Sequence, residues 1–442
     1  MKKLFTTILC LGLATTIWAQ EQQTLRLSLE DAQQYALEHN YTLQNASLDV
    51  QMAEVAKWKT LSTMLPQVNA TFDYSNMCGY EMHFGPTSIP MNPNGSFGVT
   101  ASVALTGQQV MGAIISKISE EMSNITRRQT IQQTMANVKN TYVSILVMED
   151  IVDLLDSSLA NMESLERSLV QSVSVGAAEQ IDADKLSVQV ASMRNTIASN
   201  RRSLTMLYNS MLLQLGAEVN SHIELTTQLD QIINIDNVAQ LTMHGFDIER
   251  NFNYQLLQQS ERIAKNQVTM QWLQFTPTLT AYYQYSNKTY FGKDEGMNMT
   301  PPNMIGASIS LPLFQTGARA AAIKEAKLSY QETLNSKKNA EDGLRVQYNQ
   351  LCYDLVSAIE TYQTQKTNLD VTKRVLDNTT EKFKFGRASN LEVTNASTDI
   401  ISAQSNYIQA VMSVLSSQTA LEDLLGENQY DDVVLPGEEP KK

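Results

Sequence analysis

The feature that most constrains the fold of this chain is an internal repeat: motifs of the first half recur in the same order in the second half. Asn40-Tyr-Thr-Leu43 recurs as Asn251-Phe-Asn-Tyr254, at an offset of 211 residues. Unrelated amphipathic coiled segments also resemble one another, but heptads alone would not repeat a proline, an aromatic strand and a glycine in the same order. The chain is therefore predicted to contain two internal repeats. The other matches, in chain order, are Pro66 with Pro277, residues 69–75 with 280–286, and Gly176 with Gly386.

Each repeat has one plan: a helix, two short strands joined by a loop rich in Gly, Pro and Asn, and two long helices joined by a tight turn. The expected fold is mainly α with a small antiparallel β part. The repeats cover 20–216 and 242–426, with a linker at 217–241 and an acidic tail at 427–442. The predicted elements are helices at about 29–65 and 246–275, strands at 67–75, 97–106, 278–287 and 304–314, and hairpin turns at Gly176 and Gly386.

The first 19 residues predict export. A basic start is followed by an apolar run from Leu4 to Trp18 and then by Ala19, which is the pattern of a secretory signal peptide. Cys10 suggests lipidation, but it lies inside the apolar run, where a lipoprotein site needs a small preceding residue. We therefore expect cleavage after residue 19.

Composition excludes several classes of function. The net charge of −13 disfavours binding to nucleic acid, since phosphate contacts need Lys and Arg. The four histidines are scattered without ligand spacing. There is no Gly-rich phosphate loop and no nucleophile motif. No cofactor, metal or enzymatic activity is expected.

The four predicted strands alternate between apolar and polar residues. This alternation is typical of a transmembrane barrel with lipid on one side and water on the other, although a half-buried soluble sheet shows it too. The signal peptide favours the membrane, and no later segment is long and apolar enough for a transmembrane helix. Barrels begin at about eight strands, so two or three chains would have to associate. The apolar sets are Val68, Ala70, Phe72 and Tyr74; Val99, Ala101, Val103 and Leu105; Leu279, Ala281, Tyr283 and Tyr285; and Ile305, Ala307, Ile309, Leu311 and Leu313.

The long helices carry sustained heptads. Apolar residues every three and four positions predict supercoiled helices. The other faces are rich in Gln, Asn, Ser and Thr, which suits helices wetted on both sides of a hollow cylinder. A plain antiparallel coiled coil is the alternative, but it has no use for strands between its helices. The heptad positions are Ile131, Val138, Ile145, Val152, Leu159 and Val173, then Met148, Leu155, Met162 and Leu169, and in the second repeat Tyr348, Leu355, Tyr362, Leu369, Leu376 and Phe383.

Taken together, these residues resemble the TolC-like outer-membrane factors, the outer-membrane efflux protein family, along nearly the whole mature chain. The motifs that carry the resemblance are Gly306–Phe314 with Gly317 and the basic, Ala-rich segment Arg319–Lys327, and the tips Val175-Gly176 with Asp182 and Phe385-Gly386 with Glu392.

The resemblance implies a homotrimer with a twelve-stranded barrel in the outer membrane and a helical α-barrel in the periplasm. It also implies docking to a periplasmic adaptor and an inner-membrane pump. The chain would conduct substrates outward, unchanged, in tripartite efflux or type I secretion. The alternative is a periplasmic coiled-coil scaffold without a pore.

The hairpin tips are the candidate site. The resemblance implies that the adaptor contacts the turns, and solvated turns without a partner are the alternative. Glu392 and Asn395 lie where the family often carries a gate or selectivity ring; Glu392 as an ordinary solvated carboxylate is the alternative. Asp182 matches a gate-stabilising residue of the family. The adaptor-contact candidates are Val175, Gly176, Ala177, Phe385, Gly386 and Arg387.

One loop holds soft ligands that suit Cu(I), and a flexible loop in a Met-rich chain is the alternative that we favour. Its residues are Met77, Cys78, Met82, His83 and Met91, with Met297, Met299 and Met304 in the matching loop.

Overall fold

The computed structural model describes residues 24–218, 221–228, 241–243, 245–291, 301–314 and 316–426. The expected signal peptide, the acidic tail and most of the linker lie outside these ranges. The described part is mainly helical with antiparallel strands, as expected. None of the helices in these ranges has the length and apolarity to cross a membrane.

The chain divides into two compact units. The helical unit contains the described residues of 1–45, 128–251 and 343–442, and the strand unit contains those of 46–127 and 252–342. Each unit is described by itself.

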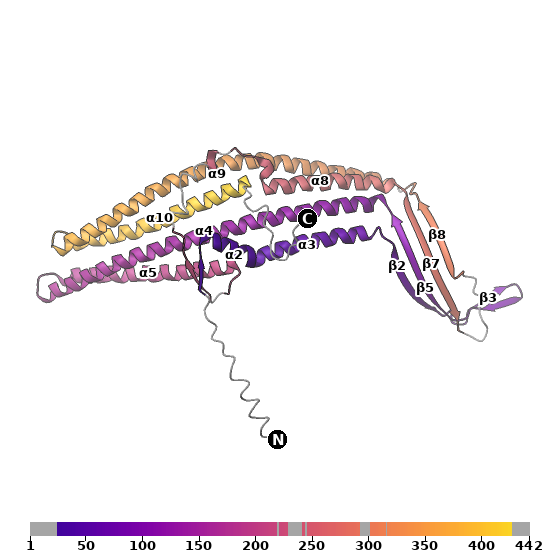
Figure 1. The fold of residues 1–442 in the computed structure, drawn as a ribbon, viewed down its shortest axis with the longest axis horizontal. Coiled ribbons are helices and arrows are strands. Elements are labelled where there is room, and N and C mark those ends of the chain that lie inside the picture. The colour runs from indigo at the N-terminus through magenta and orange to yellow at the C-terminus, as the bar shows by residue number, and fades with distance from the viewer. Residues whose placement is uncertain are drawn as a thin grey trace, which may run out of the picture. The chain divides into compact units, whose positions relative to one another are not determined.

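Two helical hairpins form most of the helical unit. α4 (Gly107–Ser174) and α5 (Gln180–Leu215) make the first, and α9 (Ala318–Lys384) and α10 (Asn390–Leu425) make the second. The first parts of α4 and α9, up to residues 127 and 342, belong to the strand unit. Both hairpins turn at the same end of this unit (Figure 1). The packed core of the four helices includes heptad residues of both hairpins, among them Leu155, Met162, Leu186, Leu355, Tyr362 and Val414.

The heptads predicted the buried seam of these helices. Ile131, Val138 and Ile145 are fully buried, and Leu376 is 4% exposed. Leu159, Val173, Leu369 and Phe383 are partly buried against the packed core of the four helices.

The predicted first helix is broken at Asn40. α2 (Leu29–His39) ends there and α3 (Tyr41–Ser62) begins. Asn40 is extended, with φ −66° and ψ 123°. Its Oδ1 accepts hydrogen bonds from the backbone N–H of Thr42 and Leu43 at 2.8 and 3.2 Å. Asn40 therefore terminates one helix and caps the next.

The second repeat has the same break. The predicted helix at 246–275 begins instead at Phe252, as α8 (Phe252–Trp272), after a short 3₁₀ turn at Ile248–Arg250 and an extended Asn251. A second 3₁₀ turn, η3 (Leu273–Phe275), follows α8.

Each break lies against the end of a return helix. Asn40 Nδ2 donates to the carbonyl of Gln214 at 2.5 Å, and Asn251 Nδ2 donates to that of Leu424 at 2.9 Å. α5 and α10 end at Gly216 and Gly426, both with positive φ. The backbone passes so close that a Cβ on either glycine would lie 2.2 Å from a carbonyl oxygen, that of His39 or Arg250. Only glycine fits this approach.

A parallel strand pair, not expected from the sequence, completes the helical unit. β1 (Thr24–Leu27) pairs with β6 (His222–Leu225). The buried hydroxyl of Tyr142 donates to the carbonyl of Leu27 at 3.0 Å and accepts from the backbone N–H of Thr226 and Thr227. Tyr142 thereby fastens both strands to α4.

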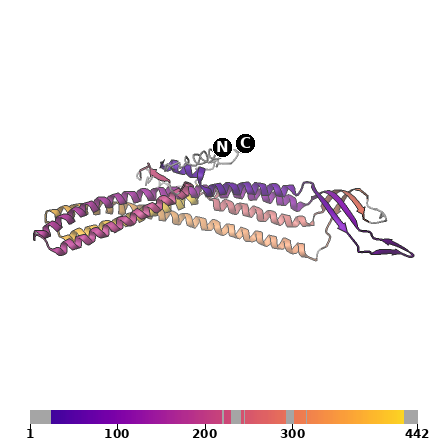
Figure 2. The same ribbon diagram turned by 90° about the horizontal axis from the view of Figure 1, so that it is seen from below.

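The strand unit holds an antiparallel sheet in the order β2-β5-β7-β8, as labelled in Figure 1. Figure 2 shows the same strands after a turn of 90°. Its strands are β2 (Gln67–Ser75), β5 (Asn94–Leu105), β7 (Thr278–Tyr290) and β8 (Asn303–Ser310). β8 ends earlier than the expected residue 314, because Pro312 has no N–H for a further strand bond. The soft-ligand loop contains an unexpected ribbon, β3 (Glu81–Phe84) with β4 (Thr87–Pro90).

The register gathers the apolar residues of all four strands on one face. Val68 pairs with Ala101, Ala101 with Tyr283, and Tyr283 with Ile305. Directly paired residues share a face, so each apolar set adds to its neighbours. Phe72, Ile305 and Ile309 are 79, 85 and 73% exposed. The sheet therefore presents a continuous apolar face and an opposite face with Asn69, Asp73, Thr100 and Gln284.

Candidate functional site

The two hairpin turns have the same backbone geometry. Gly176 and Gly386 have φ of 71° and 67°. Ala177 N donates to the carbonyl of Ser172, and Arg387 N to that of Lys382, both at 2.8 Å. A left-handed glycine followed by this long-range bond is the Schellman ending of a helix. The sequence identified both turns from their glycines.

The six adaptor-contact candidates are all exposed. Val175 and Phe385, which directly precede the two turn glycines, are 77 and 76% exposed. The two tips thus present matching apolar side chains at one end of the helical unit.

Glu392 has a structural role that the sequence analysis did not assign. Ser389 is the N-cap of α10, and Glu392 is its third residue. The Glu392 carboxylate accepts from the backbone N–H of Ser389 at 2.6 Å and from its hydroxyl at 3.1 Å. The backbone N–H bond, followed by the hydroxyl, lowers the pKa of Glu392 below its ordinary value of 4.5. The motif Ser-x-x-Glu, a capping box, was the missed signal.

Asn395 and Glu392 share a face of α10, and Asp399 extends it. Residues three and seven positions apart lie on the same side of a helix, and all three side chains are exposed. Asp399 was not among the residues predicted from the sequence, although it lies one heptad after Glu392.

Asp182 connects the hairpins through its backbone rather than its carboxylate. Asn390, which is 6% exposed, donates from Nδ2 to the carbonyl of Asp182 at 2.7 Å. The gate-stabilising role of Asp182 stays a prediction, and Asn390 was not among the residues predicted from the sequence. A buried Asn directly after the cap of α10 was its only signal.

A second polar link joins the same two helices. Gln189 Nε2 of α5 donates to Ser397 Oγ of α10 at 3.0 Å. Ser397 is fully buried and also contacts Met162 Sδ at 3.4 Å. Among the described residues, Asn390 Oδ1 and Gln404 Nε2 are buried without a hydrogen-bond partner. The seam between the hairpins is thus partly polar and incompletely satisfied.

Three candidate ligands of the soft-ligand loop, Met77, Cys78 and His83, are exposed. Cys78 is exposed, and Met77 is 51% exposed. Within the described ranges, no three His, Cys, Asp or Glu side chains lie together as metal ligands. Met297 and Met299 lie outside these ranges.

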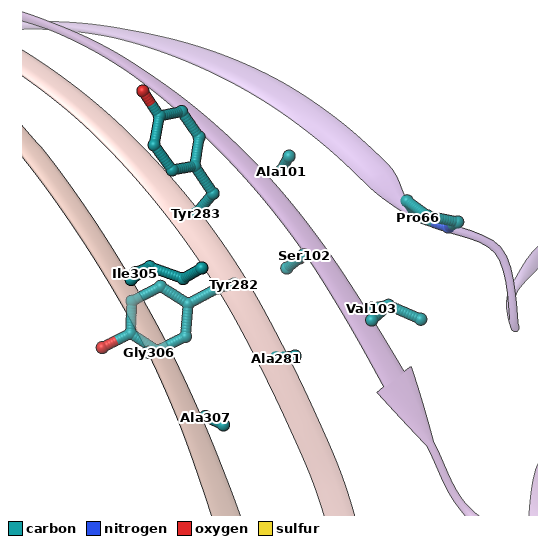
Figure 3. A pocket seen from close by; sticks show the side chains of 10 residues that line it. All are labelled: Pro66, Ala101, Ser102, Val103, Ala281, Tyr282, Tyr283, Ile305, Gly306 and Ala307. Carbon is teal, nitrogen blue, oxygen red and sulfur yellow. The ribbon is translucent and has the colours of Figure 1, made fainter.

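A shallow depression of about 430 Å³ lies on the sheet (Figure 3). Ala101, Ala281 and Ala307 line it with small apolar side chains, together with Tyr283 and Ile305. On the other face the ring of Tyr282 lies over Gly306, where a Cβ would be 2.6 Å from the ring. This glycine of the Gly306–Phe314 motif therefore makes room for an aromatic ring on the neighbouring strand.

Comparisons with known proteins agree with this architecture. Residues 248–427 match the model of the family described as Outer membrane efflux protein. CusC, whose crystal structures concern folding and transmembrane channel formation, has a TM-score of 0.71 at 17% identity over 90% of this chain and 92% of that chain. A membrane protein from Pseudomonas aeruginosa has a TM-score of 0.75 at 15% identity, with coverages of 95 and 94%.

The outer membrane protein VceC of Vibrio cholerae has a TM-score of 0.69 at 16% identity, over 90% of this chain and 96% of that chain. Among curated proteins no sequence match was found. The structural matches show the fold. With the family match, they confirm the resemblance to outer-membrane efflux proteins that the sequence predicted.

Proposed function

We propose that this chain, whose residues 248–427 match the outer membrane efflux proteins and whose fold is that of outer-membrane channels, is the outer-membrane channel of a tripartite efflux or type I secretion system. The observation that carries the proposal is the pairing of two matched helical hairpins with a sheet whose one face is apolar and exposed. Substrates pass through without chemical change.

The sheet is the membrane part. Its apolar face suits acyl chains and its opposite face suits water. β2 and β8 are the edges of the sheet, and an open edge cannot remain unpaired in lipid. Three copies joined edge to edge give twelve strands and a closed wall, with the helices of each copy lining a periplasmic tunnel.

The hairpin tips are the periplasmic end. Val175 and Phe385 offer apolar anchors to a periplasmic adaptor, with Gly176, Ala177, Gly386 and Arg387 around them. Exposed apolar side chains within a polar surround are typical of protein interfaces. An inner-membrane pump delivers substrate through that adaptor.

The gate lies just behind the tips. In a trimer, Glu392 and Asp399 would place carboxylates on one face of each α10, with Asn395 between them. Rings of carboxylates favour cations. The links from Asn390 to the Asp182 carbonyl and from Gln189 to Ser397 hold the hairpins together, and opening must break or rearrange them.

Conductance in planar bilayers tests this proposal. We expect small, mostly closed currents from the wild-type oligomer. Ser397→Ala combined with Asn390→Ala removes both links and should raise the open fraction. Glu392→Gln removes the charge but keeps an oxygen that can accept the capping bonds, so it should weaken cation preference without opening the gate.

Glu30→Ala, an exposed carboxylate on α2, is the matched control and should change neither property. A purified oligomer that never inserts into lipid would contradict the proposal and support a periplasmic scaffold. Insertion with currents that are unaffected by the double variant would contradict the gate.

A further inference from the structure

Aromatic and basic side chains meet at the junction between the strands and helices of the second repeat. The guanidinium of Arg319 lies 5.4 Å from the centre of the Phe275 ring, and Lys327 Nζ lies 5.5 Å from that of Trp272. Arg319 also donates from Nη1 to the carbonyl of Pro312 at 3.0 Å. We call Trp272, Phe275, Arg319 and Lys327 the junction cluster.

The aromatic rings of this cluster are not buried. Trp272 is 52% exposed and Phe275 is 45% exposed. Each ring covers a cation on one side and leaves much of its surface free. Aromatic rings that have apolar residues on one side and polar groups on the other are favoured at the headgroup level of a membrane.

The apolar face of the sheet continues into the junction. Beyond the end of β8, Leu311, Leu313 and Phe314 are 53, 88 and 82% exposed. Leu311 and Leu313 extend the alternation of Ile305 and Ile309 along the same segment. An acyl chain on the apolar face would therefore lead directly toward Arg319.

The charge at the junction is positive. The segment 318–328 contains Arg319, Lys324 and Lys327 and a single carboxylate, Glu325. The neighbouring end of α8 and η3, residues 266–275, contains no charged residue. The segment therefore carries a net positive charge, and Arg319 and Lys327 are the two cations that contact the aromatic rings.

The first repeat lacks this arrangement. At the repeat offsets of 210 and 211, Arg319 corresponds to Gln109, Trp272 to Leu61 and Phe275 to Met64. Only Lys327 has a basic counterpart, Lys117, which is also exposed. The common fold of the two repeats therefore does not require the aromatic and basic pairs.

We propose that the junction cluster binds the phosphate of an anionic phospholipid headgroup, with an acyl chain lying on the apolar face of the sheet. Arg319 forms charge-assisted hydrogen bonds to the phosphate, and Lys327, about 12 Å farther along the helix, adds a second positive charge. Trp272 and Phe275 flank the glycerol region. The depression lined by Ala101, Ala281 and Ala307 (Figure 3) receives part of the acyl chain. This inference rests on the proposed function, because it requires the sheet to lie in a membrane.

Lipid retention tests the inference. The full chain is purified, inserted into vesicles of phosphatidylcholine mixed with phosphatidylglycerol, extracted in mild detergent and assayed for the phospholipid that remains bound. We expect the wild type to enrich phosphatidylglycerol. Each basic side chain removed, in Lys327→Gln or Arg319→Gln, should weaken this enrichment by about fivefold.

Lys117→Gln is the matched control, because it removes an exposed lysine at the equivalent position of the first repeat. It should retain phosphatidylglycerol like the wild type. Because Arg319 also bonds to Pro312, Lys327→Gln is the decisive variant if Arg319→Gln does not fold.

Two outcomes would overturn the inference while leaving the channel intact. The first is a wild-type protein that inserts and conducts but shows no preference for phosphatidylglycerol. A preference that Lys117→Gln lowers as much as Lys327→Gln does would count in the same way. The second is release of the lipid by equimolar inorganic phosphate, which would identify a site for free phosphate. A protein that does not insert at all would remove the channel proposal and this inference together.

Discussion

The two repeats of this chain agree where a helix break lies against the end of a return helix, and they differ at the hairpin tips. Gly216 and Gly426 each admit a carbonyl of a passing segment, and Asn40 and Asn251 each fasten that segment to a return helix. The tips differ: Ser389 and Glu392 form a capping box at α10, whereas Glu179 makes no side-chain cap at α5. The contacts at the breaks are thus the same in both repeats, whereas the caps at the tips differ.

Because of this difference, we expect the two tips to differ in local stability. An N-cap side chain satisfies a backbone N–H that otherwise needs water. We therefore expect the first turn of α5 to open more readily than that of α10, although both hairpins share one core.

The largest expected effect on stability separates the glycines that end the return helices, Gly216 and Gly426, from the glycines of the hairpin tips. Gly426→Ala places a Cβ 2.2 Å from the carbonyl oxygen of Arg250, so we expect a loss of about 4 kcal/mol or failure to fold. Gly216→Ala should behave alike. Gly386→Ala has nothing within 4 Å and should cost only about 1 kcal/mol of left-handed strain. Urea unfolding of the detergent-solubilised protein measures both, and equal losses would refute the distinction.

The next effect tests whether the two breaks are equivalent. Asn251→Ala removes the bond to Leu424 and leaves a buried carbonyl unpaired, so we expect a loss of about 2 kcal/mol. Asn40→Ala should lose a similar amount, since Asn40 bonds Gln214 in the same way. Thermal unfolding monitored by circular dichroism compares them. Thr42→Ala is the control, because it removes an exposed side chain and keeps the backbone N–H that donates to Asn40. A loss confined to one repeat would show that the breaks are not equivalent.

A smaller effect separates the two caps. Ser389→Ala should destabilise the start of α10 by about 1 kcal/mol, and Glu179→Ala should change the start of α5 little. Glu179→Ser should stabilise it, because Asp182 would complete a box like that of Ser28 and Asp31. Hydrogen exchange at residues 180–184 and 390–394 reads each tip separately. Unchanged exchange in Ser389→Ala would show that the cap is redundant.

The smallest effect is a pH dependence confined to the second tip. The pKa of Glu392 is lowered in the folded protein by the Ser389 N–H and hydroxyl. A lowered pKa contributes stability above the unfolded value, and that contribution is lost as the pH falls through the folded value. Below pH 4.5, pepsin should therefore cut near Phe385 more readily with each step down. The rate of cleavage near Val175 should not show this additional increase at low pH. Glu392→Gln should abolish the increase near Phe385. An increase that persists in Glu392→Gln would assign it to another group.

Much of the fold follows from local sequence rules. The heptads gave the buried seam because burial along a helix depends on spacing alone. The alternation in the strands gave the apolar face because successive side chains point to opposite sides. Gly176 and Gly386 predicted the turns, because glycine adopts the left-handed conformation that ends a helix without the steric strain that a Cβ causes.

The breaks at Asn40 and Asn251 were missed, since an asparagine within an amphipathic pattern does not by itself end a helix. What ends it is the return helix more than 170 residues away, whose carbonyl the asparagine binds. The candidate site divides in the same way. Local spacing located the tips, but the link from Asn390 to Asp182 depends on two hairpins meeting.

The sequence alone determined the two repeats, the long helices, the strand faces and the turns, because each depends on residues close together in the chain. Only the tertiary structure decided the sheet order, the partner of Asp182, the capping role of Glu392 and the meeting of Arg319 with Phe275. These depend on distances between distant segments, which periodicity does not encode.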